Sequence, residues 1–307
     1  MTAAHRIRAL FFLHLVVAGM ATPSLAQDES AYRQQKNVVY GEAHGVGLLM
    51  DIFTPAGSKN GLAIVDVASG AWHSNRGKIV DHKRAGVFRI MTRHGYTVFA
   101  VRPGSVSRFD AIDMLEHLRR GVRFVKTHAT DYGIDPHRIG LMGASAGGHL
   151  ACLLAVEGDE DARVRAVAVF FPPTDFLDYG GKMPDLDAKG PIGAVLNRLA
   201  FRDGRRELDE TEIRRRLERI SPARRVTPST PPFLLIHGDA DPLVPLQQSQ
   251  AMLAALKEAG IPAELIVKPG GGHPWFTIAE EVEVMANWFD RQLIGNRASN
   301  PTSGTSP

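Results

Sequence analysis

The sequence predicts an α/β protein with a mostly parallel central sheet, helices on both of its faces and a small helical insertion. Short β-rich segments alternate with longer helical patterns, which is the element order of a parallel sheet covered on two sides. Several β-rich segments are continuously apolar, as at 166–171, and strands buried on both faces have this composition. A length of 307 residues, with 44% hydrophobic and 22% charged residues, fits one large globular domain.

Residues 1–26 have the features of a secretory signal peptide. Arg6 and Arg8 make a basic start, an apolar run continues to Met20, and Ser24–Ala26 provides the small residues that a signal peptidase reads. The run is short for a bilayer crossing, although an uncleaved membrane anchor has the same pattern. We therefore expect a periplasmic or secreted protein that has no membrane contact after cleavage.

The charge balance and the single cysteine exclude several classes of protein. Formal net charge is +3, and outside the first 26 residues 34 basic side chains face 33 acidic ones, which gives no reason to expect a nucleic-acid partner. Cys152 is the only cysteine, so the chain forms no internal disulfide. No His, Asp or Glu pair has convincing metal spacing, and we expect neither a metal nor a cofactor. The oligomeric state is left open.

Individual elements follow from hydrophobic periodicity. Apolar residues recur at spacings of three and four from Phe109 to Val125 and from Ile278 to Leu293, and both patterns predict amphipathic helices. The first two strand segments alternate in polarity, which suits an antiparallel hairpin at the sheet edge. The predicted strands are 37–40, 48–53, 62–67, 97–101, 138–142, 164–171, 233–237 and 264–268.

Two segments depart from this rhythm. Residues 178–226 interrupt the alternation, and within them 202–219 holds seven Arg and six Asp or Glu, a mixture that favours a solvated helix. The position suits either a cap over an active site or a simple surface insertion. Residues 296–307 are rich in Ser, Pro, Asn and Gly and are predicted to form a disordered tail. The folded domain is therefore expected to span 27–295.

A nucleophile elbow is predicted around Ser145. The sequence Gly-Ala-Ser-Ala-Gly at 143–147 lies between the strand 138–142 and an apolar helix. Such a turn strains the serine backbone, and glycines two positions to either side relieve the crowding. The turn exposes the Ser145 hydroxyl and directs the N–H of Ala146 toward the same point. Because the five-residue pattern also arises by chance, its strand-and-helix context carries the prediction.

A serine nucleophile needs a base, and the base needs an orienting group. Asp241 follows the strand 233–237, and His273 lies in a glycine-rich loop after the strand 264–268. The carboxyl ends of parallel strands meet at one edge of a sheet, so we expect both side chains near the serine. Asp239 is the competing acid. We prefer Asp241 because Asp239 lies in the tight turn, where a carboxylate tends to bond backbone.

An oxyanion hole needs at least a second N–H donor beside that of Ala146. The loop after the third predicted strand provides Gly70 and Ala71, whose backbone N–H groups are our candidates. Trp72 would then form a wall of the substrate pocket. Trp275 is a second candidate for the lining of the site, with a packing aromatic as the alternative. For the loop, the alternative is a plain strand-ending turn with a tryptophan in the core.

With these residues the chain resembles the α/β-hydrolase superfamily over nearly all of 37–295. Within it, the chain is most similar to the esterase-lipase group of small acetyl and feruloyl esterases. The segment 131–150 and the motifs around Asp241 and His273 carry the resemblance. It implies that Ser145 is the nucleophile, that the histidine is the base and that the aspartate orients it. It also implies cleavage of carboxylic esters, free or linked to polysaccharide.

The oxyanion loop departs from the pattern of this group, which usually reads His-Gly-Gly-Gly-Trp. Here Ala68 to Trp72 read Ala-Ser-Gly-Ala-Trp, and backbone donors survive such changes because every non-proline residue keeps its N–H. Two alternatives stay open. The first is an amide hydrolase, either an oligopeptidase-like peptidase or an arylformamidase. The second is a binding protein with the hydrolase fold and no activity, because a fold alone does not establish catalysis.

Overall fold

A computed structural model of the chain describes residues 31–187 and 191–295. The predicted signal peptide, 1–26, and the predicted tail, 296–307, lie outside the described residues. Among the helices of the described ranges, none combines the length and the apolar character that a membrane crossing requires.

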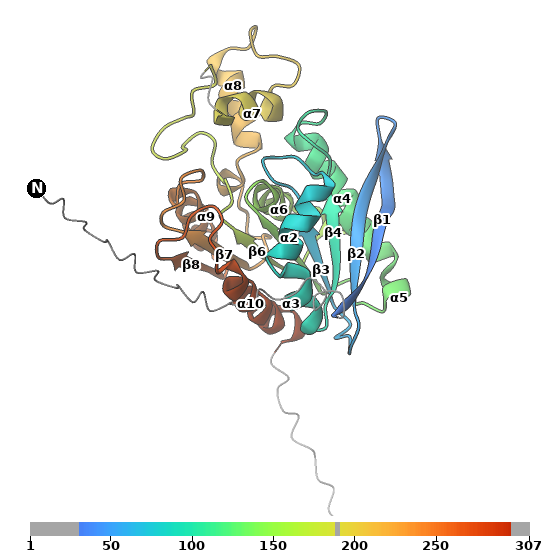
Figure 1. Ribbon diagram of the computed structural model, residues 1–307. Helices are drawn as coiled ribbons and strands as arrows, with labels where there is room; N and C mark the ends of the chain where they lie inside the picture. The colour runs from blue at the N-terminus through green and yellow to red at the C-terminus, as the bar shows by residue number, and fades with distance from the viewer. Residues whose placement is uncertain (1–30, 188–190, 296–307) are drawn as a thin grey trace, which may run out of the picture.

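Within the described residues the chain builds one eight-stranded sheet, in the order β1-β2-β4-β3-β5-β6-β7-β8 (Figure 1). Strand β2 is antiparallel to both of its neighbours, and every other pair is parallel. The strands are β1 Tyr32–Ala43, β2 Val46–Pro55, β3 Ala63–Val67, β4 Thr97–Arg102, β5 Ile139–Ala144, β6 Ala166–Phe170, β7 Phe233–Gly238 and β8 Ala263–Lys268.

The hairpin predicted at the sheet edge is confirmed, but the prediction for its first strand was too short. Strand β1 extends well beyond 37–40 on both sides and pairs with β2 along its length, with two register shifts. All of its additional residues except Tyr32 are exposed or half-buried, so they lack the apolar periodicity that marks a strand in a sequence. The central strands β3, β6 and β7 are buried throughout, as their apolar composition predicts.

Helices cover both faces of the sheet and divide the hydrophobic core in two. One face carries α4 Ala111–Thr127, α6 Ala146–Val156 and α9 Gln247–Glu258. The other carries α2 Arg76–Arg84, α3 Val87–Arg93 and α10 Ile278–Phe289. The shorter helical segments are α5 Ala129–Tyr132, η1 Glu160–Ala162 and η3 Asp290–Ile294.

The segment between β6 and β7 forms the predicted insertion. It holds α7 Pro191–Ala200, α8 Glu210–Arg219 and η2 Pro222–Arg224. Figure 1 shows α7 and α8 together at one end of the molecule, at the top of the view. The solvated helix expected here is confirmed: α8 begins after the N-cap Asp209 and carries two ion pairs of i, i+4 spacing, Glu210–Arg214 and Glu212–Arg216.

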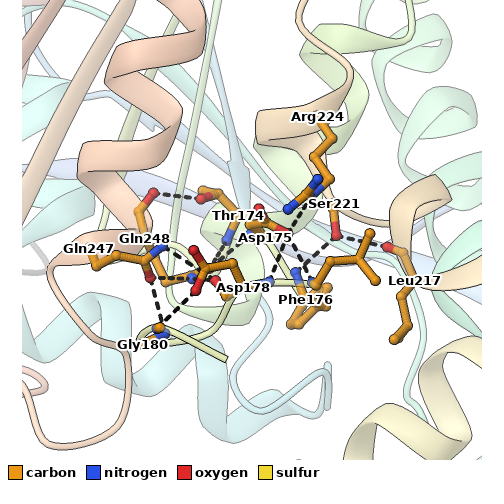
Figure 2. Close-up of polar contacts among 12 residues, drawn as sticks. Thr174, Asp175, Phe176, Asp178, Gly180, Leu217, Ser221, Arg224, Gln247 and Gln248 are labelled. Atoms are coloured by element: carbon orange, nitrogen blue, oxygen red, sulfur yellow. Dashed lines mark hydrogen bonds and ion pairs between the residues drawn. The ribbon is translucent and has the colours of Figure 1, made fainter. Parts of the chain in front are cut away.

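A buried polar junction fixes the base of the insertion, as Figure 2 shows. Gln248 of α9 is fully buried, and its side-chain amide oxygen Oε1 accepts the N–H groups of Thr174 and Asp175, each at 2.8 Å. At the far end of the insertion, the Ser221 hydroxyl accepts the N–H of Phe176 at 2.9 Å. The two ends of the insertion are therefore bonded to each other, and the first is bonded to the body of the domain.

Candidate active site

Backbone contacts, rather than side chains, shape the turn that carries Ser145. The residue lies between β5 and α6 with φ 53° and ψ −121°, a conformation that L-residues rarely adopt. A Cβ at Gly147 would lie 2.2 Å from the carbonyl oxygen of Val67, and one at Gly143 would lie 2.5 Å from the backbone of Gly147. The Ser145 N–H is donated to the carbonyl of Phe170 at 2.9 Å. Both glycines are therefore required by close backbone approach.

The structure brings the predicted serine, histidine and aspartate into one hydrogen-bonded line. His273 Nε2 lies 2.9 Å from Ser145 Oγ, and His273 Nδ1 lies 2.6 Å from Asp241 Oδ2. The other carboxylate oxygen of Asp241 accepts the N–H groups of Leu243 and Val244, at 2.8 and 3.0 Å. In this geometry the imidazole can accept the serine proton at one nitrogen while the carboxylate holds the other.

The Asp241 carboxylate is buried, with no exposed side-chain surface, and is nevertheless stabilised as the anion. Burial is the largest influence and raises its pKa, but the hydrogen bonds from His237, His273 and the two backbone N–H groups outweigh it. The pKa of Asp241 therefore lies well below its usual range. A permanent negative charge at this position favours the tautomer in which His273 Nδ1 carries the proton and Nε2 faces the serine as an acceptor.

Two neighbours of the acid have supporting roles. Asp239 accepts the N–H of Gly270 at 2.6 Å, so it shapes the turn, as the sequence suggests, and does not contact the imidazole of His273. His237 was not singled out by the sequence, yet its Nε2 lies 2.9 Å from the carbonyl of Val244 and 3.5 Å from the Asp241 carboxylate. Its only signal in the sequence is its position at the end of β7, where the acid loop begins.

The loop after β3 is strained at two residues that are not glycine. Ala71 has φ 47° and Trp72 has φ 55°. The expected donor Gly70 does not fit, because its N–H closes the turn by bonding the carbonyl of His73 at 3.0 Å. Within the described part of the chain, the N–H groups of Ala71 and Ala146 make no hydrogen bond. These two donors are the ones that the geometry leaves available beside the serine.

A buried histidine connects this loop to the helix behind the serine. Trp72 donates its indole N–H to His149 Nδ1 at 2.9 Å, and His149 Nε2 lies 2.7 Å from the carbonyl of Ile220. Since an indole only donates, Nδ1 must be the acceptor and Nε2 must carry the proton. Burial lowers the pKa of His149 to about 4, against the opposing hydrogen bond to Ile220, so the ring is neutral. The neutral ring links the loop, α6 and the insertion.

A cavity of about 450 Å³ opens beside Ser145 and His273. Its lining is largely apolar, and the insertion contributes Tyr179 and Val195 to it. The other apolar lining residues include Phe171, Leu243, Pro274 and Ile278. Across the described ranges, no group of three or more His, Cys, Asp or Glu is placed to hold a metal ion.

The two tryptophans predicted as pocket walls have different positions. Trp72 does border the cavity, although only 4% of its surface is exposed and most of the ring packs in the core. Trp275 does not line the cavity. Its indole N–H is donated to Glu281 at 2.7 Å, and its ring packs against Phe170 and Phe171. Trp275 therefore connects the loop of His273 to α10, through Glu281, and to β6, through Phe170.

Comparison with known proteins decides the family. Residues 50–256, more than half of the chain, match the BD-FAE family. The chain belongs to the BD-FAE family. Solved structures of esterases superpose on this chain over most of its length, which confirms the expected α/β-hydrolase fold. The similar proteins reported below are esterases by name, in agreement with the esterase resemblance that the motifs indicate.

Two curated relatives illustrate the sequence similarity. Esterase LipQ of Mycobacterium tuberculosis is 26% identical over 265 residues, which cover 81% of this chain and 59% of LipQ. The probable isoprenylcysteine alpha-carbonyl methylesterase ICME of Oryza sativa subsp. japonica is 27% identical over 249 residues, covering 78% of this chain and 57% of its own length. The chain thus spans less than two thirds of the length of the curated relatives it matches.

Two solved structures illustrate the structural similarity. A truncated carbohydrate esterase from gut microbiota superposes with a TM-score of 0.73 at 25% identity, covering 87% of this chain and 98% of that protein. Esterase 2 of Thermogutta terrifontis superposes with a TM-score of 0.63 at 22% identity, covering 89% and 96%. The second likeness concerns the fold alone.

Proposed function

We propose that this protein is a serine hydrolase that cleaves carboxylic esters with Ser145, His273 and Asp241. The observation that carries the proposal is the unbroken hydrogen-bonded line from the serine hydroxyl through the imidazole to a buried carboxylate. The names of two proteins of similar sequence, an esterase and a probable methylesterase, support the choice of an ester bond.

The reaction is acyl transfer in two steps. Ser145 Oγ attacks the ester carbonyl carbon while His273 Nε2 takes its proton, and the N–H groups of Ala71 and Ala146 hold the oxyanion that forms. The C–O bond then breaks, His273 returns the proton to the leaving alcohol, and the acyl group stays on the serine. A water molecule, activated by His273, then attacks the acyl carbonyl carbon in the same way, which releases the acid and restores the Ser145 hydroxyl. These steps need no cofactor.

The substrates that we propose are esters of short acyl or feruloyl groups, free or attached to polysaccharide. The cavity beside the serine has a volume of about 450 Å³, which leaves room for a short acyl group or for a feruloyl group. Support for a polysaccharide link comes from similar proteins described as a carbohydrate esterase and as an acetyl ester-xyloside bifunctional hydrolase. A panel of acyl lengths and alcohols on the purified protein tests this assignment.

Replacement of the nucleophile is the direct test. Ser145→Ala should lower hydrolysis of p-nitrophenyl acetate by a factor on the order of 10⁴ or more, because the acyl-enzyme cannot form. Circular dichroism and the melting temperature should match those of the wild type. A fluorophosphonate probe should label Ser145 in the wild type alone, whereas a non-catalytic binding protein would not be labelled. Unchanged turnover in the purified variant contradicts the proposal.

A matched pair of aspartates tests the identity of the acid. Asp241→Asn removes the charge that orients His273 and should lower kcat by about 10⁴-fold. Asp239→Asn keeps an oxygen that can accept the Gly270 N–H, so kcat should change by less than about threefold. Equal losses in the two variants would contradict the assignment of Asp241.

Ester preference and export complete the proposal. Assays of acetyl and feruloyl esters beside N-formylkynurenine and prolyl-peptide anilides should show faster cleavage of the esters. Faster cleavage of an amide would mean that the protein is an amide hydrolase.

Export to the periplasm or the medium is supported by the basic start and apolar run within 1–26. Cell fractionation with and without these residues tests it, since only the longer chain should leave the cytoplasm.

A further inference from the structure

Helix α2 turns a polar face toward the cavity. Lys78, Asp81 and His82 have the i, i+3, i+4 spacing of residues on one helix face, and all three line the cavity. Of the residues of α2, all of them described, Ile79 alone is buried. The rest of the lining is largely apolar and includes Tyr179 and Leu243. The cavity thus has a polar wall and an apolar wall.

His82 is held by a carboxylate that lies inside the sheet. Its Nδ1 lies 2.7 Å from one oxygen of Asp66, a fully buried residue of β3. The second oxygen of Asp66 has no hydrogen-bond partner among the described residues. Burying a carboxylate in a parallel strand destabilises a fold, and an aliphatic residue would pack there without that cost. The placement therefore indicates a function for the pair.

The pairing leaves one nitrogen of His82 for a bound molecule. Nδ1 is committed to Asp66, and Nε2 makes no hydrogen bond within the described part of the chain. Burial lowers the pKa of His82, but the charge of Asp66 and its hydrogen bond outweigh burial, so the pKa is raised. At Nε2 the neutral ring accepts and the protonated ring donates, and a hydroxyl group can meet either need.

Lys78 lies against the loop that carries the oxyanion donors. A Cβ at Gly70 would be 2.9 Å from Lys78 Cδ and 3.2 Å from its Nζ, so the missing side chain leaves room for the lysine. Lys78 Nζ also lies 2.7 Å from Asp81. Because each cation of this wall is paired with a carboxylate, the wall offers donors and acceptors without a large net charge. Such a wall suits hydroxyl groups better than an anion.

A second buried carboxylate fixes the start of the helix. Arg76 Nη1 lies 3.0 Å from Asp51, a fully buried residue of β2. With the pair of Asp66 and His82 near the end of α2, the helix is bonded to the sheet at two places. The polar wall is therefore held in position before a ligand enters, which lowers the entropy cost of binding.

We propose that His82 and Lys78 are specificity-determining residues that bind hydroxyl groups on the alcohol part of the ester, with Asp66 as the residue that positions His82. The inference rests on the proposed ester hydrolysis and deepens it, since it assigns the two parts of the substrate to two walls. The acyl group lies along the apolar wall, and the hydroxylated alcohol lies along α2.

Two acetate esters with three-carbon alcohols test the inference. Glyceryl monoacetate carries two free hydroxyls and propyl acetate carries none, so their kcat/KM ratio reports recognition of hydroxyl groups. His82→Asn keeps a donor near Asp66 and removes Nε2, and Lys78→Met keeps length and removes charge. Each variant should lower kcat/KM for glyceryl monoacetate about tenfold, mainly through KM, and that for propyl acetate by at most about twofold.

Further variants separate positioning from damage to the fold. Asp66→Asn should lower the same ratio by a smaller factor. His94→Asn is the matched control, because His94 also bonds carboxylates, those of Glu283 and Asp290, away from the cavity. The ratio should not change in this control.

An unchanged ratio in both His82→Asn and Lys78→Met overturns the inference, as does an equal loss for the two esters. A wild-type protein that cleaves neither ester, or a Ser145→Ala variant that cleaves both, contradicts the proposed function instead.

Discussion

Two tight turns border the serine hydroxyl, and they reach their shapes by different means. The turn of Ser145 has glycines wherever another backbone comes close, at Gly143 and Gly147. Positive φ at a residue other than glycine is common to both turns, at Ser145 in the first and at Ala71 and Trp72 in the loop after β3. A backbone contact at 2.2 Å excludes any side chain, whereas a positive φ costs roughly 1–2 kcal/mol per residue and can be offset by other contacts. The first turn is therefore far less tolerant of substitution.

Gly147→Ala should have the largest effect. Its Cβ would lie 2.2 Å from a backbone oxygen of β3, so either the strand or α6 must move. We expect a loss of several kcal/mol in the free energy of unfolding, on the order of 3 or more, and no measurable hydrolysis. Gly148→Ala is the control, because its nearest contacts are at 3.2 Å and the loss should be smaller. Wild-type stability in Gly147→Ala would remove the distinction between the turns.

The neutral His149, which joins the two turns, should make stability depend on pH. Its pKa is lowered from 6.5 to about 4 on folding, so as pH falls through this window the unfolded chain takes up a proton that the folded chain does not. Stability should be complete above pH ~7 and fall by about 3 kcal/mol toward pH ~4. Urea unfolding at several pH values measures the slope. His149→Gln should be less stable at neutral pH but should lose that part of the slope, and an identical slope would refute the assignment.

Ala71→Gly should have the smallest effect. Glycine adopts φ 47° without strain and keeps the backbone N–H, so activity should stay within about threefold and stability should change by less than about 1 kcal/mol. Ala85→Gly is the matched control at φ −70°, where glycine only adds freedom to the unfolded chain and should destabilise by roughly 0.5–1 kcal/mol. Equal destabilisation in the two variants would mean that Ala71 is not strained.

The site was predictable to different degrees for the same physical reasons. The surroundings of Ser145 show in the sequence because steric exclusion leaves glycine as the only choice. Gly70 was expected to donate, but its N–H closes the turn, and no local pattern reveals that bond. Trp275 was a candidate for the pocket, yet Glu281 and two phenylalanines hold it elsewhere. His82 had no signal, since its partner is a single aspartate within an apolar strand.

By itself the sequence determined the alternation of strands and helices, the elbow, and the order of serine, acid and base along the chain. These features depend on periodicity and on clashes between residues close together in sequence, so they can be read locally. Only the tertiary structure decided which N–H groups are available, which side chains face the cavity and why α2 presents a polar wall. Those outcomes depend on packing between segments far apart in the chain. Examples are the strand of Asp66 with the helix of His82, and Tyr179 of the insertion with the loop of Asp241.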